Sequence, residues 1–312
     1  MRTWQDEPSV LGALAQLATE PAFVTPRCMA SFGRASLHRY EPGTALSQVS
    51  EPGGPLGEGM LRRLAEVFAR TAAVGSDQLP PLPPEWPRDH KDSDGFLDRL
   101  VAHADREVYQ PHRGEFGALF DALDVPADAL ARFRAGGAFR TKELQRRPYA
   151  LLHTDLHRDN IVLLEDGGLF VLDWELATYG DPLHDLATHL ERMQYTRDER
   201  ELMKEMWEET LVRRGCSAMT AGMDTDLQTY VDFEHVQSVF ADVVRAAVRL
   251  GTEPGNARLG QSVGMVRRAL ERAQGPMGLD AVPDEAAVGA ALIGWHALRY
   301  PGRRRRWFRT RL

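Results

Sequence analysis

Three polar residues with side chains that bind metal ions and accept protons fall within one short segment of the chain. Asp155, Asn160 and Asp173 lie in the sequence LLHTDLHRDNIVLLEDGGLFVLDWE, which occupies positions 151–175. Phosphoryl transfer needs a divalent cation held by hard carboxylate and amide oxygens, and a further carboxylate that accepts a hydroxyl proton. We therefore predict phosphoryl transfer, with Asn160 and Asp173 as Mg²⁺ ligands and Asp155 as the base.

A predicted β-hairpin brings the three side chains together. Two apolar runs, at positions 161–164 and 169–172, flank the turn-forming sequence Glu-Asp-Gly-Gly. If the central Asp-Gly pair forms a two-residue turn, Asn160 lies opposite Asp173 across the ladder. Asp155 precedes the first strand on a loop and is free to face the same point.

Three motifs in this region resemble those of aminoglycoside phosphotransferases and their choline-kinase-like relatives. HTDLHRDN at 153–160 is similar to their H-x-D-x-x-x-x-N catalytic loop, VLDWE at 171–175 to their metal-binding D-x-[DE] strand, and GDPLHDLA at 180–187 to their G-D-P-x-x-D-L-A segment. The resemblance extends over residues 7–250. It implies a protein-kinase-like α+β fold and transfer of the γ-phosphate of ATP or GTP to a hydroxyl of a small molecule. An aminoglycoside or another antibiotic as acceptor would imply a role in antibiotic resistance.

The resemblance also implies a nucleotide site in the first part of the chain. The sequence YEPG at 40–43 is similar to the hinge of that family, which would place the nucleotide base beside it. The glutamate of the small-lobe helix would be Glu7. The nucleotide-binding residues that the resemblance implies are therefore Leu37, His38, Tyr40 and Glu7.

Two further parts of that nucleotide site, a Gly-rich loop and a strand lysine, would lie upstream of Met1. The glycine-dense stretch at 53–59 follows the hinge and is interrupted by proline, so it cannot replace the loop. Loss of half the small lobe, a misassigned start, or substitution by another group are open explanations. We expect the chain as given to bind nucleotide weakly and to turn over slowly or not at all.

Two alternatives come from other functional classes. A catalytically impaired, pseudokinase-like binding protein is favoured by the missing lysine and glycine loop and opposed by the intact polar residues. A metallohydrolase is favoured by the alternation His153, Asp155, His157, Asp159, since these side chains share one face of an extended strand and such sets bind Zn²⁺ or Fe²⁺. That interpretation leaves Asn160 and the hairpin unexplained.

Several neighbouring residues are expected to support the site or to shape its charge. We expect His153 and Asp185 to hold the catalytic loop by hydrogen bonds, and Asp181 to cap the helix that follows it. Acidic side chains are also expected to make the substrate groove anionic, which would suit a cationic acceptor. These are Asp159, Glu175, Asp181 and Glu191.

The elements that must position these residues follow from hydrophobic spacing. Apolar residues at helical spacing predict helices around 10–17, 60–68, 96–101 and 116–123, and two short runs within 29–40 predict strands. Segments rich in proline, at 49–59 and 79–87, predict loops. We expect an α+β fold in three parts. They are a truncated N-terminal lobe and hinge at 1–45, a mostly helical catalytic and substrate lobe at 46–300, and a basic tail at 301–312.

Composition limits the partners of the protein. Its 312 residues carry a net charge of -7, which argues against nucleic-acid binding because phosphate neutralisation needs a basic surface. No apolar run is long enough for a membrane span, and the start has no signal-peptide pattern. Cys28 and Cys216 lie far apart and indicate no disulfide framework. We expect a cytoplasmic protein with a small hydroxylated substrate and with no nucleic-acid or membrane partner. The acceptor's identity, ATP versus GTP and the oligomeric state stay open.

Overall fold

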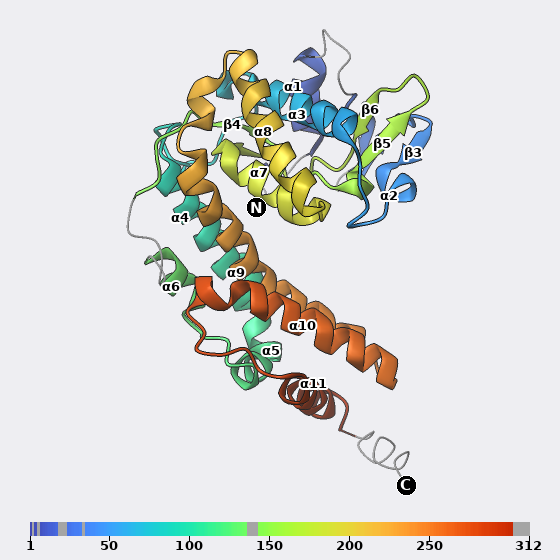
Figure 1. Cartoon of the computed structure of the whole chain (residues 1–312), viewed down its shortest axis with the longest axis vertical. Helices are drawn as coiled ribbons and strands as arrows, with labels where there is room; N and C mark the ends of the chain where they lie inside the picture. Colours follow the sequence, from blue (N-terminus) through green and yellow to red (C-terminus); the bar gives the residue numbers. More distant parts are fainter. Residues whose placement is uncertain (2, 5–6, 18–23, 33–34, 136–142, 302–312) are drawn as a thin grey trace. The chain divides into compact units, whose positions relative to one another are not determined.

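The computed structural model describes residues 1–301 except 2, 5–6, 18–23, 33–34 and 136–142 (Figure 1). The chain divides into two compact units. The first unit combines Met1–Leu97 with Glu143–Val231, and the second combines Asp98–Lys142 with Asp232–Leu312. The predicted lobe boundary at residue 45 falls inside the first unit and stays a prediction. Residues 302–312 of the predicted basic tail lie outside the described residues.

The first unit contains a small antiparallel sheet that carries the predicted hairpin. Its strand order is β3-β5-β6, and Figure 1 shows these strands side by side. Their bounds are β3 Gly43–Ala45, β5 Ile161–Leu164 and β6 Leu169–Val171. The two hairpin strands are confirmed, whereas β3 was not predicted. Gly43 pairs with Leu164, and a Cβ at Gly43 would overlap the Leu163 carbonyl group. Glycine at this position therefore permits the close approach of β3 to β5.

The register of the hairpin differs from the predicted one. Ile161 lies opposite Val171, so the loop contains the three residues 165–167 instead of two. Gly167 adopts a left-handed backbone with φ of 83°, and the Gly168 N–H donates to Asp166 Oδ1 at 2.7 Å. A left-handed glycine in third position favours this three-residue loop.

The predicted pairing of Asn160 with Asp173 is therefore wrong. Asn160 lies one residue before β5, and its carbonyl oxygen accepts the Leu172 N–H at 2.8 Å. Asp173 is the next residue along and has left the ladder, with a φ of 60°. The two side chains reach the same end of the hairpin without being opposite each other.

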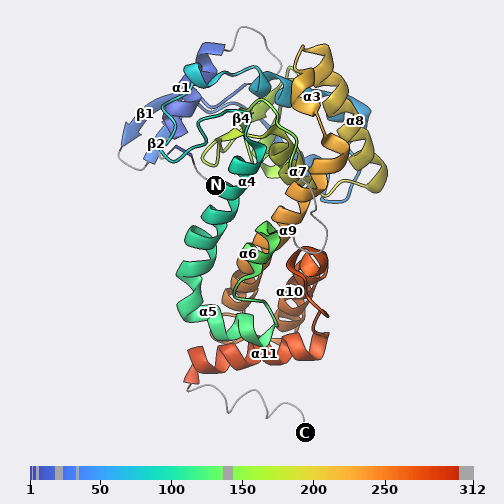
Figure 2. The same cartoon turned by 90° about the vertical axis from the view of Figure 1, so that its left-hand side faces the viewer.

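Two further strand pairs lie in the first unit. The strands predicted within residues 29–40 are confirmed as an antiparallel pair that contacts α1 (Figure 2), with β1 at Cys28–Phe32, β2 at Ala35–His38 and α1 at Glu7–Leu17. A second pair, β4 and β7, was not predicted. It joins Ala150–Leu152 to Thr178–Gly180, and all six residues are buried. β4 leads directly into the catalytic loop, and β7 leads into helix α7 (Pro182–Met193).

The helices of the first unit cover the catalytic segment. Helix α3 packs against α8, and the apolar face predicted for residues 60–68 is buried in the structure, including Leu61, Leu64 and Phe68. The predicted helix is therefore confirmed. The helix bounds are α2 Leu46–Val49, α3 Glu58–Ala72, α4 Ser93–His103 and α8 Arg197–Arg213, of which α4 continues into the second unit.

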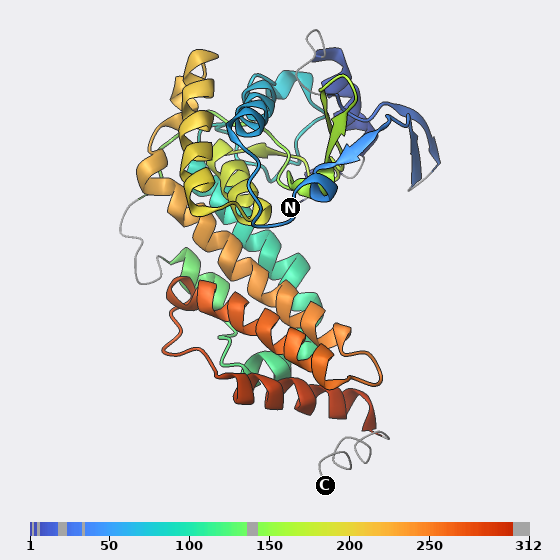
Figure 3. The ribbon, with the colours of Figure 1, turned by 45° about the vertical axis from the view of Figure 1, so that its right-hand side comes forward.

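The second unit is helical in its described residues. Helix α9 enters it from the first unit, α10 packs on α11 (Figure 3), and α11 also contacts α5. The bounds are α5 Gln110–Ala122, α6 Ala129–Arg134, α9 Met223–Arg249, α10 Asn256–Met277 and α11 Glu285–Arg299. Tyr109, Phe120 and Phe240 form an aromatic cluster in its core, with ring centroids 4.8 to 5.7 Å apart. No described helix combines the length and apolarity that crossing a membrane requires.

Gly180 provides a test of the packing around β7. A Cβ at this position would overlap the ring of Phe96, which is fully buried. We expect Gly180→Ala to lower the free energy of unfolding by about 1–3 kcal/mol through overpacking. The control is Gly12→Ala in α1, where a Cβ meets nothing within 4 Å. It should raise stability by about 0.5–1 kcal/mol, since alanine favours helix. Urea denaturation measures both, and equal stability of the two variants would contradict the packing analysis.

Candidate active site

The loop between β4 and β5 carries the predicted base, and Asp185 on α7 holds its backbone. The Asp185 carboxylate accepts the N–H of His153 at 3.1 Å and that of Thr154 at 2.7 Å. Thr154 has a φ of 59°, a left-handed conformation that costs free energy in a β-branched residue. Asp181 accepts the Leu183 N–H at 3.0 Å and caps α7. These are the contacts that the predicted supporting and capping functions require.

His153 ties the start of the loop to the hairpin. Its side chain is buried, Nε2 lies 2.9 Å from the Leu172 carbonyl oxygen, and Nδ1 accepts the Asp155 N–H at 3.2 Å. Burial lowers the pKa of His153 to about 4, so the imidazole is neutral near pH 7 and donates from Nε2. Both ring nitrogens are used in the fold, which agrees with support of the loop.

Both carboxylate oxygens of Asp155 have partners. Oδ1 forms an ion pair with Arg192 at the end of α7 and lies 3.5 Å from His157 Nε2. Oδ2 lies 3.4 Å from Asn160 Nδ2, which also donates to the Asp155 carbonyl oxygen at 2.9 Å. Burial raises the pKa of Asp155 and the nearby Asp173 adds to the rise, whereas Arg192 and His157 oppose it. Asp155, Asn160 and Asp173 therefore converge, as the sequence predicts.

The donor groups of Asn160 and Asp173 suit a magnesium ion. The amide nitrogen of Asn160 is used within the loop, so its amide oxygen is the atom that could bind a cation. Asp173 follows β6 and is exposed. The next residue, Trp174, donates its N–H to Glu7 Oε1 at 2.9 Å, which fixes the backbone beside Asp173. A carboxylate and an amide oxygen are hard ligands of the kind that Mg²⁺ takes.

The arrangement that a metallohydrolase needs is absent from the described residues. β4 ends at Leu152, so the alternating histidines and aspartates do not share a strand face, and both nitrogens of His153 are engaged. In the part of the chain that the structure describes, no three or more His, Cys, Asp or Glu residues form a metal site.

The predicted nucleotide-binding residues are only partly brought together. Glu7 begins α1, and its Oε2 lies 4.0 Å from His38 Nε2 on β2. Together with the contact to Trp174, this places Glu7 and His38 beside the end of β6. Leu37 and Tyr40 are exposed, at 58% and 82% of their surfaces.

The sequence did not indicate the arginines that hold the site. Arg158, within the catalytic loop, is buried and donates to the carbonyl oxygens of Met193, Ser50 and Gly54 at 2.8 to 3.1 Å. Arg158 thereby holds the segment 49–59, predicted only as a proline-rich loop, against the catalytic loop. The one feature of the sequence that could have indicated this contact is the position of Arg158 in the middle of the catalytic motif.

A second arginine, Arg147, is fully buried and anchors the start of α7. It pairs with Asp181 at 2.8 Å and with Asp226 at 2.6 Å. The predicted anionic groove is accordingly weaker than expected. Asp181 is buried and neutralised by Arg147, and Glu191 pairs with Arg200 at 2.7 Å.

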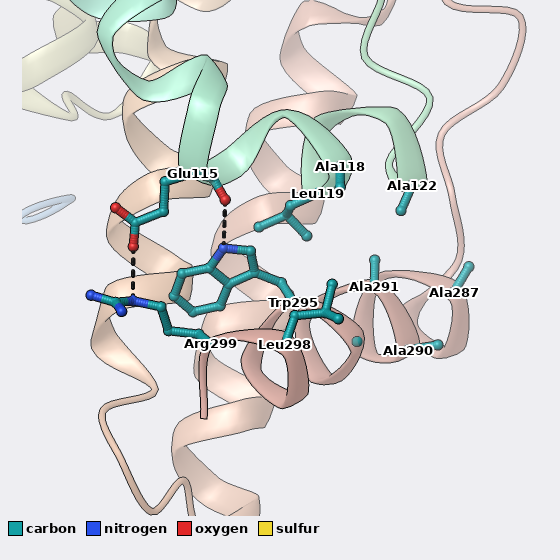
Figure 4. A pocket seen from close by; sticks show the side chains of 11 residues that line it. Glu115, Ala118, Leu119, Ala122, Ala287, Ala290, Ala291, Trp295, Leu298 and Arg299 are labelled. Atoms are coloured by element: carbon teal, nitrogen blue, oxygen red, sulfur yellow. Dashed lines mark hydrogen bonds and ion pairs between the residues drawn. The ribbon is translucent and has the colours of Figure 1, made fainter. Parts of the chain in front are cut away.

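A pocket of about 710 Å³ lies in the second unit, between α5 and α11 (Figure 4). Alanine and leucine side chains line most of it. Its two charged lining residues, Glu115 and Arg299, pair with each other at 3.1 Å, and the Trp295 indole donates to the Glu115 carbonyl oxygen. The lining therefore lacks the set of acid and amide groups that distinguishes the catalytic loop.

Comparison with known proteins identifies the family of the chain. The model of the phosphotransferase enzyme family matches residues 6–223. A search of curated proteins gave no match. A solved structure described as an aminoglycoside phosphotransferase of Ralstonia eutropha JMP134 is similar, with 16% identity, 87% of this chain and 81% of that chain covered, and a TM-score of 0.50.

Two kinase structures are also similar. An ethanolamine kinase of Plasmodium vivax has 12% identity over 93% of this chain and 72% of its own, with a TM-score of 0.48. A choline/ethanolamine kinase family protein of Mesorhizobium loti has 15% identity over 93% and 85%, again with a TM-score of 0.48.

The buried carboxyl group of Asp185 predicts a pH dependence. Burial raises its pKa from an ordinary 3.8 to about 6. Between these values the folded chain keeps a proton that the unfolded chain has released, so the stability contributed by Asp185 falls as pH rises and is lost above about 6. Relative to Asp185→Asn, the wild type should lose roughly 2–3 kcal/mol of unfolding free energy between pH 4 and pH 7.

Urea denaturation across this pH range measures the difference between the two proteins. The matched control is Asp159→Asn, because Asp159 is 74% exposed and lies on the same loop. The unfolding free energy of this variant, plotted against pH, should run parallel to that of the wild type. A difference between wild type and Asp185→Asn that stays constant with pH would contradict the assignment.

Proposed function

The chain belongs to the phosphotransferase enzyme family, and from this premise we propose that it transfers the γ-phosphate of ATP or GTP to a hydroxyl of a small molecule. The observation that carries the proposal is the convergence of Asp155, Asn160 and Asp173 at one end of the hairpin. An aminoglycoside, or another hydroxylated antibiotic or metabolite, is the proposed class of acceptor. An antibiotic as acceptor would make the protein a resistance enzyme.

Asp155 is the proposed base. The acceptor oxygen attacks the γ-phosphorus, its proton passes to the Asp155 carboxylate, and the bond from phosphorus to the β–γ bridging oxygen breaks with its electron pair leaving on the nucleoside diphosphate. Burial raises the pKa of Asp155, which favours uptake of the proton. The Asn160 amide, bonded to the same carboxylate, holds it in position. In a loose transition state such positioning matters more than basicity.

Asn160 and Asp173 are the proposed Mg²⁺ ligands. When bound, the ion would supply positive charge that offsets the charge of the phosphates. The contribution of the chain is to hold both donors at one end of the hairpin. The Asp155 loop fixes Asn160 through its amide nitrogen, and the Trp174 N–H bond to Glu7 fixes the backbone beside Asp173.

The nucleotide would lie between this hairpin end and the first part of the chain. The contacts of Glu7 with Trp174 and His38 support a nucleotide site on this side of Asp173. Leu37 and Tyr40 would provide exposed apolar surface for the base. The pseudokinase-like alternative is not favoured, because the chain keeps Asp155, Asn160 and Asp173, the proposed base and the proposed metal ligands.

Replacement of the base tests the proposed chemistry. We expect Asp155→Asn to lower kcat for phosphate transfer by about 10²–10⁴-fold, because the amide cannot accept the proton. Nucleotide binding should change little. The assay follows transfer from radiolabelled ATP and GTP to a panel of hydroxylated acceptors, with Asp121→Asn in α5, an exposed aspartate outside the catalytic loop, as the control. Full activity of Asp155→Asn would disprove the assignment.

Magnesium dependence tests the metal ligands separately. Calorimetry with ATP and GTP should detect binding that requires Mg²⁺ and that a chelator abolishes. Asp173→Ala should weaken this binding by roughly tenfold or more, equivalent to about 1.4 kcal/mol or more. Asp166→Ala, on the exposed hairpin loop, serves as the control and should bind like the wild type. Equal binding by wild type and Asp173→Ala would remove Asp173 from the metal site.

A further inference from the structure

The catalytic carboxylate has a cationic partner that the reaction as described does not use. Arg192 Nη1 pairs with Asp155 Oδ1, while the other oxygen, Oδ2, faces the Asn160 amide. A base must offer an oxygen to the acceptor hydroxyl at hydrogen-bond distance. The acceptor hydroxyl therefore competes with one of these two partners for its position on the carboxylate.

Burial decides which partner moves. Asn160 is buried and donates to two oxygens of Asp155, one of them in the backbone. Arg192 lies in the last turn of α7, its side chain is 39% exposed, and its described hydrogen bond is the one to Asp155. Arg192 is thus the more exposed of the two partners, so its guanidinium can move into solvent while Asn160 stays packed. The acceptor hydroxyl can take its place at Oδ1.

The displaced guanidinium stays close to the reacting atoms. A hydroxyl bound to Oδ1 attacks a phosphorus that lies about 3 Å beyond it. The moving phosphoryl group spreads negative charge over three oxygens, and guanidinium groups bind such oxygens in a bidentate manner. Because Arg192 starts from the carboxylate that holds the hydroxyl, we expect its guanidinium to reach these oxygens.

The neighbouring arginines are committed to the fold. Arg158 is buried and donates to three backbone carbonyl oxygens, and Arg147 is fully buried between Asp181 and Asp226. Among these three arginines of the first unit, Arg192 is the one whose partner is the reacting carboxylate and whose side chain is exposed.

We propose that Arg192 is a catalytic residue, whose guanidinium leaves Oδ1 of Asp155 when the acceptor binds and then contacts the oxygens of the phosphoryl group in transit. This inference rests on the proposed function. The hydroxyl proton still passes to Asp155, and the phosphorus–oxygen bond to the leaving diphosphate still breaks with its electron pair. Arg192 contributes positive charge and neither gains nor loses a proton.

A binding experiment separates this function from a structural one without knowledge of the acceptor. MgADP, or MgGDP if the chain prefers guanine, is titrated into wild type, Arg192→Ala and Arg192→Lys, with and without fluoroaluminate. Fluoroaluminate mimics the planar phosphoryl group in transit. Arg213→Ala is the control, because Arg213 is an arginine of similar exposure that pairs with Glu66 far along the sequence.

We expect Arg192→Ala to weaken binding of the fluoroaluminate complex by about 10²-fold, while MgADP alone binds as in the wild type. The affinity of Arg192→Lys for the fluoroaluminate complex should lie between those of the wild type and Arg192→Ala, since lysine keeps the charge but lacks the planar guanidinium. Arg213→Ala should bind both probes like the wild type. Thermal unfolding checks that each variant is folded. If Arg192→Ala does not fold, Arg192→Lys is used for the comparison with the wild type.

Two results would overturn the inference and leave the proposed function standing. The first is that folded Arg192 variants bind MgADP with fluoroaluminate as tightly as the wild type. The second is that they lose the same affinity for MgADP with and without fluoroaluminate, which would mean that Arg192 only shapes the site. Absence of any MgADP or MgGDP binding by the wild type would overturn both proposals together.

Discussion

The geometry of the site depends on one buried carboxylate. Asp185 accepts the N–H groups of His153 and Thr154, and these bonds hold Thr154 in a left-handed conformation that its side chain disfavours. The turn at Thr154 directs Asp155 toward Asn160. Ionised Asp185 is stabilised by two donors and destabilised by complete burial, and its raised pKa reports that balance. Without this interaction the turn at Thr154 would lose the two bonds that hold its backbone.

Helix α7 transmits that constraint to the rest of the first unit. Its N-terminus is held by Asp181, which caps the helix and pairs with buried Arg147. Its C-terminus reaches Asp155 through Arg192 and reaches the catalytic loop through the Met193 carbonyl, which accepts from Arg158. One helix therefore positions the base from both ends. Replacing Arg147 with a neutral side chain would leave the buried Asp181 carboxylate without its cation, which is far more costly than losing an exposed ion pair.

Local patterns in the sequence were sufficient to predict most of the elements around the candidate site. Apolar spacing identified α3 and the two hairpin strands, and residue chemistry identified Asp155, Asn160 and Asp173. The predicted hairpin register was wrong by one residue, because the same sequence permits a two-residue or a three-residue loop and the backbone conformation of Gly167 decides between them. The strands β3, β4 and β7 were missed because three residues are too few to show a period, and none of them flanks the turn sequence that identified the equally short β6. The partners of Arg147, Arg158 and Arg192 are set by tertiary packing, which no local pattern encodes.

The pairing of β3 with β5 has a consequence for protein engineering. Gly43 is the last residue of the hinge-like segment 40–43 and the first of β3, and it lies against Leu163 and Leu164, so this segment runs directly into the sheet of the catalytic hairpin. Segments 40–49 and 161–172 therefore form a single exchangeable module, although more than a hundred residues separate them in sequence. A chimera that takes one segment from a relative must take the other as well. Otherwise a side chain at the position of Gly43 would separate the two strands.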